Sequence, residues 1–172
     1  RALRPGDDVR RVDVLDYTPR WYRKIYVKGY LKLIEHAPDL YAMMFKKTDN
    51  PALARKLTKL RRSISKYRTH KFVSHLRRFD PEVVLCTHYM PLEIMGQLKD
   101  DPKLAFRPLV VSVVTDFEAH ALWMEPCVNL FCVAAPATKA RLVARGAKDA
   151  DVAVTGIPIA AKFSARVDTD RS

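Results

Sequence analysis

Residues 109–114 are almost all apolar and β-branched, and the run stops abruptly at two polar residues. A short run of this kind is typical of a strand buried on both faces of a parallel sheet. Similar runs occur at residues 9–15, 83–86, 130–134 and 152–155, and helical patterns separate them at about residues 19–37, 51–79, 92–99 and 138–145. This alternation predicts an α/β fold with a mostly parallel sheet and helices on both of its faces.

The last of these predicted helices carries signals at both ends. Thr138 has the side chain of an N-cap residue, Arg145 places a cation in the last turn, and Gly146 follows directly. A cation and then a glycine favour the end of a helix at this point.

Two predicted strands end in similar polar loops. The loop after residue 114 contains Thr115, Asp116, His120 and Trp123, and the loop after residue 86 contains Thr87, His88 and Pro91. In open parallel sheets, ligands bind in the crevice beyond the carboxyl ends of the strands. If the two strands are neighbours, both histidines lie on one edge of the sheet, where a cleft is expected.

The same residues also have an ordinary structural interpretation. Asp116 could cap the next helix, His120 could be a solvated loop residue, and Trp123 could belong to the core. Spacing alone leaves both interpretations open, although the repetition of the pattern at a second strand raises the odds of a cleft.

The positive charge of the chain is concentrated in one block. Residues 18–79 contain 17 Lys or Arg against 3 acidic residues, a net of +14, whereas the rest has 14 basic and 16 acidic residues. The whole formal net charge of +12 therefore comes from this block, which predicts a localised positive surface.

The first helix of this block combines aromatic and cationic side chains. Aromatic rings with polar tips beside Lys and Arg suit the boundary between lipid head groups and acyl chains. Each nearby cation contributes ~1 kcal/mol of attraction to an anionic membrane. We therefore expect a peripheral membrane-binding surface at Trp21, Tyr22, Lys24, Tyr26, Lys28, Tyr30, Met43, Met44 and Phe45.

The second helix of the block, at residues 51–79, also has an apolar stripe opposite a basic face. For both helices, the ordinary interpretation is a stripe packed on the sheet and a basic face in solvent. Nucleic acid is the competing polyanion. The sequence has no recognised nucleic-acid-binding motif, and its aromatic residues alternate with Leu, Ile and Met instead of forming a stacking platform, so no nucleic-acid partner is expected.

Several catalytic and metal-binding signatures are absent from the sequence. There is no dinucleotide-binding or phosphate-binding glycine motif, no G-x-S-x-G and no H-E-x-x-H. Cys86, Cys127 and Cys132 are odd in number, lie in or beside apolar runs and lack zinc-site spacing. We therefore expect reduced, buried thiols in a cytosolic protein, and no metal site.

A series of segments, taken in order, resembles one known family. The segments are 12–16 (VDVLD), 24–30 (KIYVKGY), 37–41 (APDLY), 80–84 (DPEVV), 87–88 (TH), 114–123 (VTDFEAHALW) and 154–158 (VTGIP). From about residue 9 to residue 163, the chain resembles the N-terminal domain of the monogalactosyldiacylglycerol synthase and processive diacylglycerol glucosyltransferase family. The resemblance implies one Rossmann-like, N-terminally incomplete half of a two-domain GT-B fold.

The resemblance also implies a domain organisation and an activity. Residues 1–163 would form the lipid-acceptor, membrane-facing domain, and residues 164–172 would begin a linker to a nucleotide-sugar domain. Such enzymes move a hexose from a UDP-sugar, UDP-glucose or UDP-galactose, to the 3-hydroxyl of diacylglycerol. The expected location is cytoplasmic, peripheral on the inner face of the cell membrane.

The family's T-D-x-x-x-H-x-x-W pattern matches Asp116, His120 and Trp123. Asp116 and His120 are therefore the catalytic candidates, and Thr87, His88, Pro91, Thr115 and Trp123 are the acceptor-binding candidates. Gly156, Ile157 and Pro158 would line the cleft between the two domains.

Two parts of the family pattern lie outside the 172 residues. The first strand and its Gly-rich loop, whose His is usually proposed as the general base, would precede residue 1, and the donor-binding domain would follow Ser172. We therefore expect neither a bound cofactor nor transferase activity from these residues alone. Two other functions stay open: a related transferase that acts on another lipid-linked acceptor, and a non-catalytic membrane-binding module. The module would have no polar crevice, and its His88 and His120 would be buried or scattered.

Overall fold

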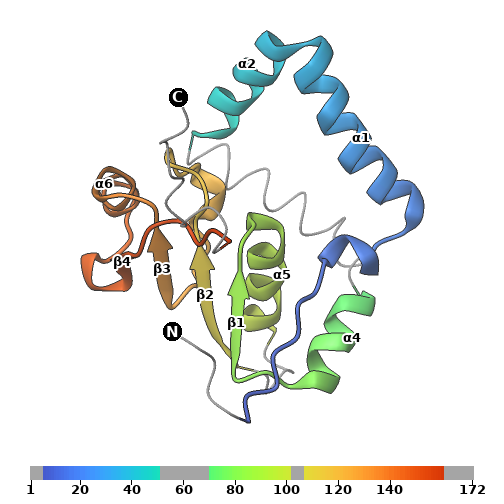
Figure 1. The fold of residues 1–172 in the computed structure, drawn as a ribbon, viewed down its shortest axis with the longest axis vertical. Helices are drawn as coiled ribbons and strands as arrows, with labels where there is room; N and C mark the ends of the chain where they lie inside the picture. The colour runs from blue at the N-terminus through green and yellow to red at the C-terminus, as the bar shows by residue number, and fades with distance from the viewer. Residues whose placement is uncertain (1–5, 51–69, 102–106, 161–172) are drawn as a thin grey trace, which may run out of the picture. The chain divides into compact units, whose positions relative to one another are not determined.

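The computed structural model describes residues 6–50, 70–101 and 107–160, which fall into two compact units (Figure 1). The first unit is Arg1–Pro81 and the second is Glu82–Ser172. The linker predicted at residues 164–172 lies outside the described residues.

The first unit is helical in its described residues. An extended segment leads into a short 3-10 helix, η1 (Val14–Tyr17), which is followed by α1 (Arg20–His36), α2 (Pro38–Thr48) and α4 (His70–Phe79). The second predicted helix is confirmed only from His70 onward, because its residues 51–69 lie outside the described part of the chain.

The strand predicted at residues 9–15 is wrong. Asp13 Oδ1 instead accepts a hydrogen bond from the Leu15 backbone N–H at 2.9 Å and caps η1. A strand forms only where its backbone pairs with another strand, and the ladders of the described residues join β1 to β4 of the second unit alone. The apolar alternation indicates an extended segment, but it cannot supply the pairing partner.

Ala37 divides the aromatic segment into two helices. It has φ −146° and ψ 58°, and Pro38 begins α2 directly after it. A proline ring disfavours helical geometry in the preceding residue, yet proline itself is well tolerated in the first helical turn. The rings of Tyr30 and Tyr41, 5.8 Å apart, join α1 to α2. Neither helix buries any residue fully, so its apolar side chains remain partly exposed.

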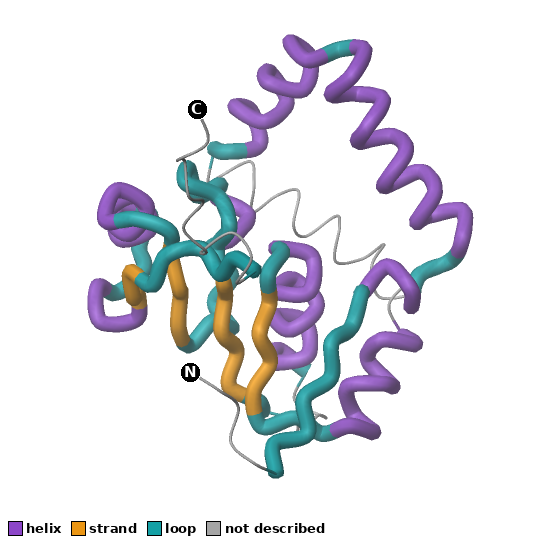
Figure 2. The backbone as a smooth tube through the Cα atoms, viewed as in Figure 1, coloured by secondary structure: helices purple, strands orange, loops and turns teal. Residues whose placement is uncertain are grey.

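The second unit contains a four-stranded parallel sheet in the spatial order β1-β2-β3-β4 (Figure 2). The strands are β1 (Val83–Cys86), β2 (Leu109–Val113), β3 (Leu130–Val133) and β4 (Val152–Val154). The connections contain α5 (Tyr89–Asp100), then η2 (Ala121–Trp123), and finally α6 (Pro136–Ala144) with η3 (Asp149–Asp151). This arrangement confirms the predicted α/β, Rossmann-like fold with a parallel sheet flanked by helices.

The core of this unit lies on one face of the sheet. A row of side chains that are neighbours in register crosses all four strands and is at most 5% exposed: Cys86, Ser112, Phe131 and Val152. Right-handed connections between successive parallel neighbours place α5 and α6 over this face. Leu92 from α5 and Leu142 from α6 are fully buried there.

The end of α6 agrees with the sequence, whereas its start does not. Arg145 is the C-cap, and Gly146 follows with a φ of +106°, a conformation that favours glycine. The N-cap, however, is Ala135 and not Thr138, because Pro136 can occupy the first turn of the helix. Thr138 lies inside the helix, and its side chain is buried.

Burial raises the pKa of the Cys86 thiol from 9.0 to about 12, and the neighbouring Cys127 adds to the rise. The folded state therefore keeps a proton that the unfolded chain loses above pH 9.0. The resulting stabilisation is complete below pH 9.0 and is lost as the pH rises to about 12.

We expect the free energy of unfolding of the native chain, relative to Cys86→Ala, to fall between pH 9.0 and about pH 12. Urea unfolding at a series of pH values measures the difference, and a pH-independent difference would contradict the assignment.

Candidate functional site

The two predicted polar loops leave the same edge of the sheet. β1 and β2 are direct parallel neighbours, and Cys86 at the end of β1 pairs with Ser112 near the end of β2. Thr87 and Thr115 follow these strands, and both are exposed. The two strands are therefore neighbours, as the expectation that both loops lie on one edge of the sheet requires.

His88 determines where α5 begins. Its Nδ1 accepts a hydrogen bond from the Met90 backbone N–H at 3.1 Å, so His88 is the N-cap of the helix. This cap starts α5 at Tyr89, ahead of the predicted start at residue 92, and places Pro91 in the first turn. The imidazole is thus held at the carboxyl end of β1, where it also lies against the Tyr89 ring with 4.2 Å between the ring centroids.

An aromatic contact brings the two loops together. The ring of Tyr89, which follows β1, meets Trp123, which follows β2, edge to face at 6.5 Å. Trp123 is only 2% exposed, in agreement with the alternative that it belongs to the core. A buried tryptophan can still position a functional edge, because it fixes the loop that carries it.

His120 is buried and caps the short helix η2. It is 4% exposed, and its Nδ1 accepts a hydrogen bond from the Leu122 backbone N–H at 3.1 Å. A neutral imidazole that accepts at Nδ1 carries its proton on Nε2. In this arrangement Nε2 acts as a hydrogen-bond donor, and it would have to lose its proton before it could act as a base.

Asp116 is fixed by the buried indole. Trp123 donates a hydrogen bond from Nε1 to Asp116 Oδ2 at 2.8 Å, whereas the aspartate itself lies exposed at the edge. Asp116 therefore does not cap the next helix, which was the ordinary interpretation of this residue. A carboxylate has about four acceptor positions, so one bond to the indole leaves Asp116 able to accept from a further donor.

Helix α6 holds the remainder of the β2 loop. Thr138 donates from Oγ1 to the Phe117 carbonyl at 2.7 Å. Arg141 donates from Nε to the Ala119 carbonyl at 3.2 Å, and it pairs with Glu118 through its guanidinium at 2.7 Å. No sequence pattern connected these residues, which lie about twenty positions apart. The signal that could have been used is that Thr138 is polar in a helix expected to pack on the sheet.

The strand β4 ends at the same edge. The backbone N–H groups of Thr155 and Gly156 both donate to the Val133 carbonyl, at 3.0 and 3.2 Å. Gly156 has a φ of +76°, which L side chains rarely adopt. Ile157 and Pro158 continue from this fixed turn. The role of residues 156–158 in an interdomain cleft stays a prediction.

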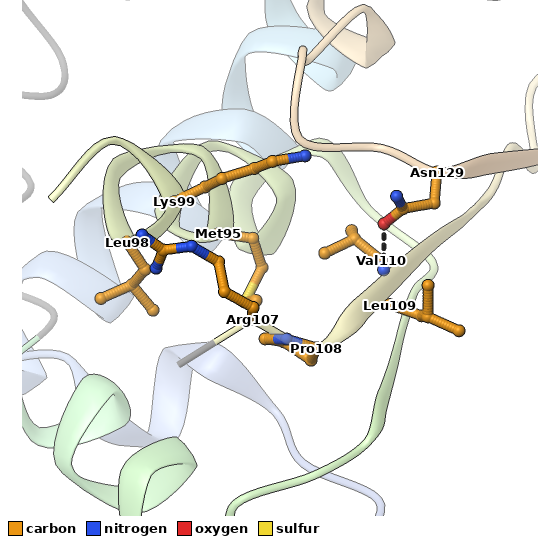
Figure 3. Close-up of a pocket in the computed structure, with 8 residues that line it drawn as sticks. All are labelled: Met95, Leu98, Lys99, Arg107, Pro108, Leu109, Val110 and Asn129. Atoms are coloured by element: carbon orange, nitrogen blue, oxygen red, sulfur yellow. Dashed lines mark hydrogen bonds between the residues drawn. The ribbon is translucent and has the colours of Figure 1, made fainter. Parts of the chain in front are cut away.

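A cavity of about 150 Å³ occurs at the other end of the sheet (Figure 3). It lies where β2 begins and α5 ends, and it is lined by Met95, Leu98, Lys99, Arg107, Pro108, Leu109, Val110 and Asn129. Asn129 Oδ1 accepts from the Val110 backbone N–H at 2.9 Å beside it. This cavity contains none of the predicted site residues, so it is separate from the edge that carries Asp116.

The predicted membrane-binding residues lie on α1 and α2. Trp21 is 54% exposed, and Lys24, Lys28, Tyr30, Met43 and Met44 are exposed as well, whereas Tyr22, Tyr26 and Phe45 are half-buried. The half-buried rings pack within the unit, for example Tyr22 against Tyr26 at 5.9 Å. Within the described ranges, no helix has the length and apolar content needed to cross a bilayer, and no His, Cys, Asp and Glu cluster could hold a metal ion.

Comparison with known proteins identifies related sequences. The family model described as monogalactosyldiacylglycerol (MGDG) synthase matches residues 2–159. The chain is 25% identical over 160 residues to "uncharacterized glycosyltransferase YkoN" of Bacillus subtilis (strain 168), which covers 92% of the chain and 41% of that protein. No solved structure matches the chain significantly.

Two further relatives are named "processive diacylglycerol beta-glucosyltransferase". The protein of Staphylococcus carnosus (strain TM300) is 28% identical over 103 residues, or 60% of the chain and 25% of the relative. The protein of Staphylococcus epidermidis (strain ATCC 12228) is 29% identical over 104 residues, or 60% of the chain and 26% of the relative. The chain thus spans less than half the length of each of these relatives.

Proposed function

The chain belongs to the monogalactosyldiacylglycerol (MGDG) synthase family, and we propose that it forms the lipid-acceptor half of a glycosyltransferase. The transferase moves a hexose from UDP-glucose or UDP-galactose to the hydroxyl of diacylglycerol. The donor sugar binds outside these residues. Relatives named as diacylglycerol glucosyltransferases support the acceptor class.

The observation that carries this proposal is the meeting of two strand exits at one sheet edge. The Tyr89–Trp123 contact joins the loops, and Trp123 in turn holds the carboxylate of Asp116. A module that only adhered to membranes would have no use for an exposed carboxylate fixed by an indole at the carboxyl ends of parallel strands, although the burial of His120 agrees with that alternative.

The two groups have distinct roles in the proposed reaction. The acceptor hydroxyl attacks the anomeric carbon of the sugar, and the bond to the diphosphate breaks. Asp116 accepts a hydrogen bond from the hydroxyl and takes its proton as the new bond forms, and His120 donates from Nε2 to an acceptor oxygen. Stabilisation of the leaving diphosphate comes from the donor half of the transferase.

The helices α1 and α2 bring the acceptor half to its lipid substrate. Exposed Trp21, Met43 and Met44 insert shallowly, and exposed Lys24 and Lys28 lie at the level of anionic head groups. The proposed binding is peripheral and reversible, and the family resemblance implies that it occurs on the cytoplasmic face of the cell membrane.

Transferase activity tests the proposal directly. A longer transferase that contains this chain is expected to convert a radiolabelled UDP-hexose and diacylglycerol vesicles to glycolipid, with one of UDP-glucose and UDP-galactose preferred. The 172-residue chain alone is expected to make none, because the proposal assigns the diphosphate to the other half of the transferase. Glycolipid formed by the chain alone, or a longer protein inactive with both donors, would contradict the proposal.

A further inference from the structure

The loop after β2 is fixed residue by residue. The Asp116 carboxylate is bonded to the Trp123 indole, and the Phe117 carbonyl accepts from Thr138. Glu118 pairs with Arg141, which also bonds the Ala119 carbonyl. These successive contacts fix the backbone of the loop. The positions of its exposed side chains are therefore restricted.

Residues 115–118 of this loop are all exposed, and Phe117 is the apolar side chain among them. Phe117 is 71% exposed. Its backbone carbonyl accepts a hydrogen bond from the hydroxyl of Thr138, a residue that is only 1% exposed. A mobile loop could fold an aromatic ring back onto the protein, but this loop is tied on both sides of the ring. Phe117 also follows Asp116 directly in the chain, at the sheet edge where ligands of open α/β sheets bind.

We infer that Phe117 is a binding contact for the apolar, acyl-bearing part of a glycerolipid acceptor. The inference rests on the proposed function and extends it, because it assigns the acyl chains to a ring next to the carboxylate that receives the hydroxyl. A glycerolipid has its hydroxyl and its acyl chains on adjacent carbons, so neighbouring polar and apolar contacts suit it.

Thr138 and Arg141 are positioning residues in this scheme. Thr138 positions Phe117 by donating a hydrogen bond to the Phe117 carbonyl. Arg141 holds the next two residues, Glu118 and Ala119. Neither side chain needs to touch the lipid. Their loss would leave the ring present but no longer fixed beside Asp116.

The test is flotation of the 172-residue chain with phosphatidylglycerol–phosphatidylcholine vesicles, with and without diacylglycerol. The wild-type chain is expected to bind the plain vesicles and to gain affinity when diacylglycerol is present. Phe117→Ala is expected to weaken that gain about tenfold, since burial of an aromatic ring is worth at least this factor, whereas Phe117→Leu retains most of it. Binding to plain vesicles should not change.

The outcomes separate the inference from the proposed function. A wild-type chain that gains nothing from diacylglycerol overturns both. A gain that survives in Phe117→Ala overturns the role of Phe117 and leaves the proposed function intact. Equal losses on both kinds of vesicle would make Phe117 a general membrane anchor, which also overturns the inference.

Matched variants of Thr138 test positioning apart from folding. Thr138→Val removes the hydroxyl at constant shape and is expected to reduce the gain in vesicle affinity that diacylglycerol causes. Thr138→Ser keeps a hydroxyl and is expected to retain this gain in affinity. Urea unfolding of both variants reports on fold stability. If the gain in affinity varies with the free energy of unfolding of the variants, and not with the presence of the hydroxyl, Thr138 has a structural role only.

Discussion

Replacing Asp116 by Asn is expected to lower glycolipid synthesis by the longer transferase at least about 100-fold, the usual contribution of a positioned acid or base. The amide oxygen of Asn can still accept the hydrogen bond that Trp123 Nε1 donates at 2.8 Å, so the loop keeps its conformation. Only the negative charge beside the acceptor hydroxyl is lost. Initial rates with saturating donor and diacylglycerol vesicles measure the effect.

Asp116→Ala serves as the comparison because it removes the charge and the hydrogen bond together. The indole N–H of Trp123, which is 2% exposed, then lacks its acceptor, and the free energy of unfolding should fall by about 1–3 kcal/mol. Trp123→Phe removes the donor and keeps a ring and the carboxylate. If Asp116 served only to hold Trp123, Asp116→Asn would stay active and Trp123→Phe would not.

The second large effect is expected at the membrane surface. Combining Trp21→Ala, Tyr26→Ala and Lys24→Glu removes two rings, one exposed and one half-buried, and reverses one exposed cation. Together these changes should weaken binding to anionic vesicles by more than about 3 kcal/mol, or more than about 100-fold. Flotation with phosphatidylglycerol vesicles measures the bound fraction.

The matched control is Lys148→Glu, which makes the same change of charge at an exposed residue of the second unit. It should leave binding nearly unchanged, because Lys148 is not part of the proposed membrane-binding surface on α1 and α2. Equal losses for both variants would mean that net charge, and not the surface of α1 and α2, drives binding. If the triple variant still binds the vesicles, the proposal that α1 and α2 contact the membrane is wrong.

The sequence predicted the bounds of the strands well, but not burial of both faces of the sheet, because Leu85 and Leu109 are 66% and 57% exposed. The strand at Val83–Cys86 has the predicted bounds, and β2, β3 and β4 end one or two residues earlier than predicted. The strand predicted at residues 9–15 failed for a physical reason: alternation records which side chains can be buried, whereas a strand also needs a backbone partner.

Local chemistry at the candidate site was only partly readable. Thr and His after two apolar runs, with Asp after the second, indicated the edge correctly, and the adjacency of β1 and β2 joins the two loops there. That both imidazoles use Nδ1 to cap a helix was not predicted, although His88 and His120 each stand directly before a helical segment. The assignment of Thr138 as a cap failed because Pro136 was equally able to begin the helix.

The sequence by itself determined the parallel α/β architecture, the edge where polar residues gather, the basic aromatic segment and the family. The first three properties follow from hydrophobic periodicity, chain direction and composition, which are local or additive, whereas the family follows from the resemblance of a series of segments taken in order. Only the tertiary structure decided that Asp116 is held by Trp123 and that α6 fixes the loop beside it, leaving Phe117 exposed. Residues 21 and 22 positions apart make the contacts to α6, and a hydrogen bond of that kind depends on where two distant segments pack, which no local pattern encodes.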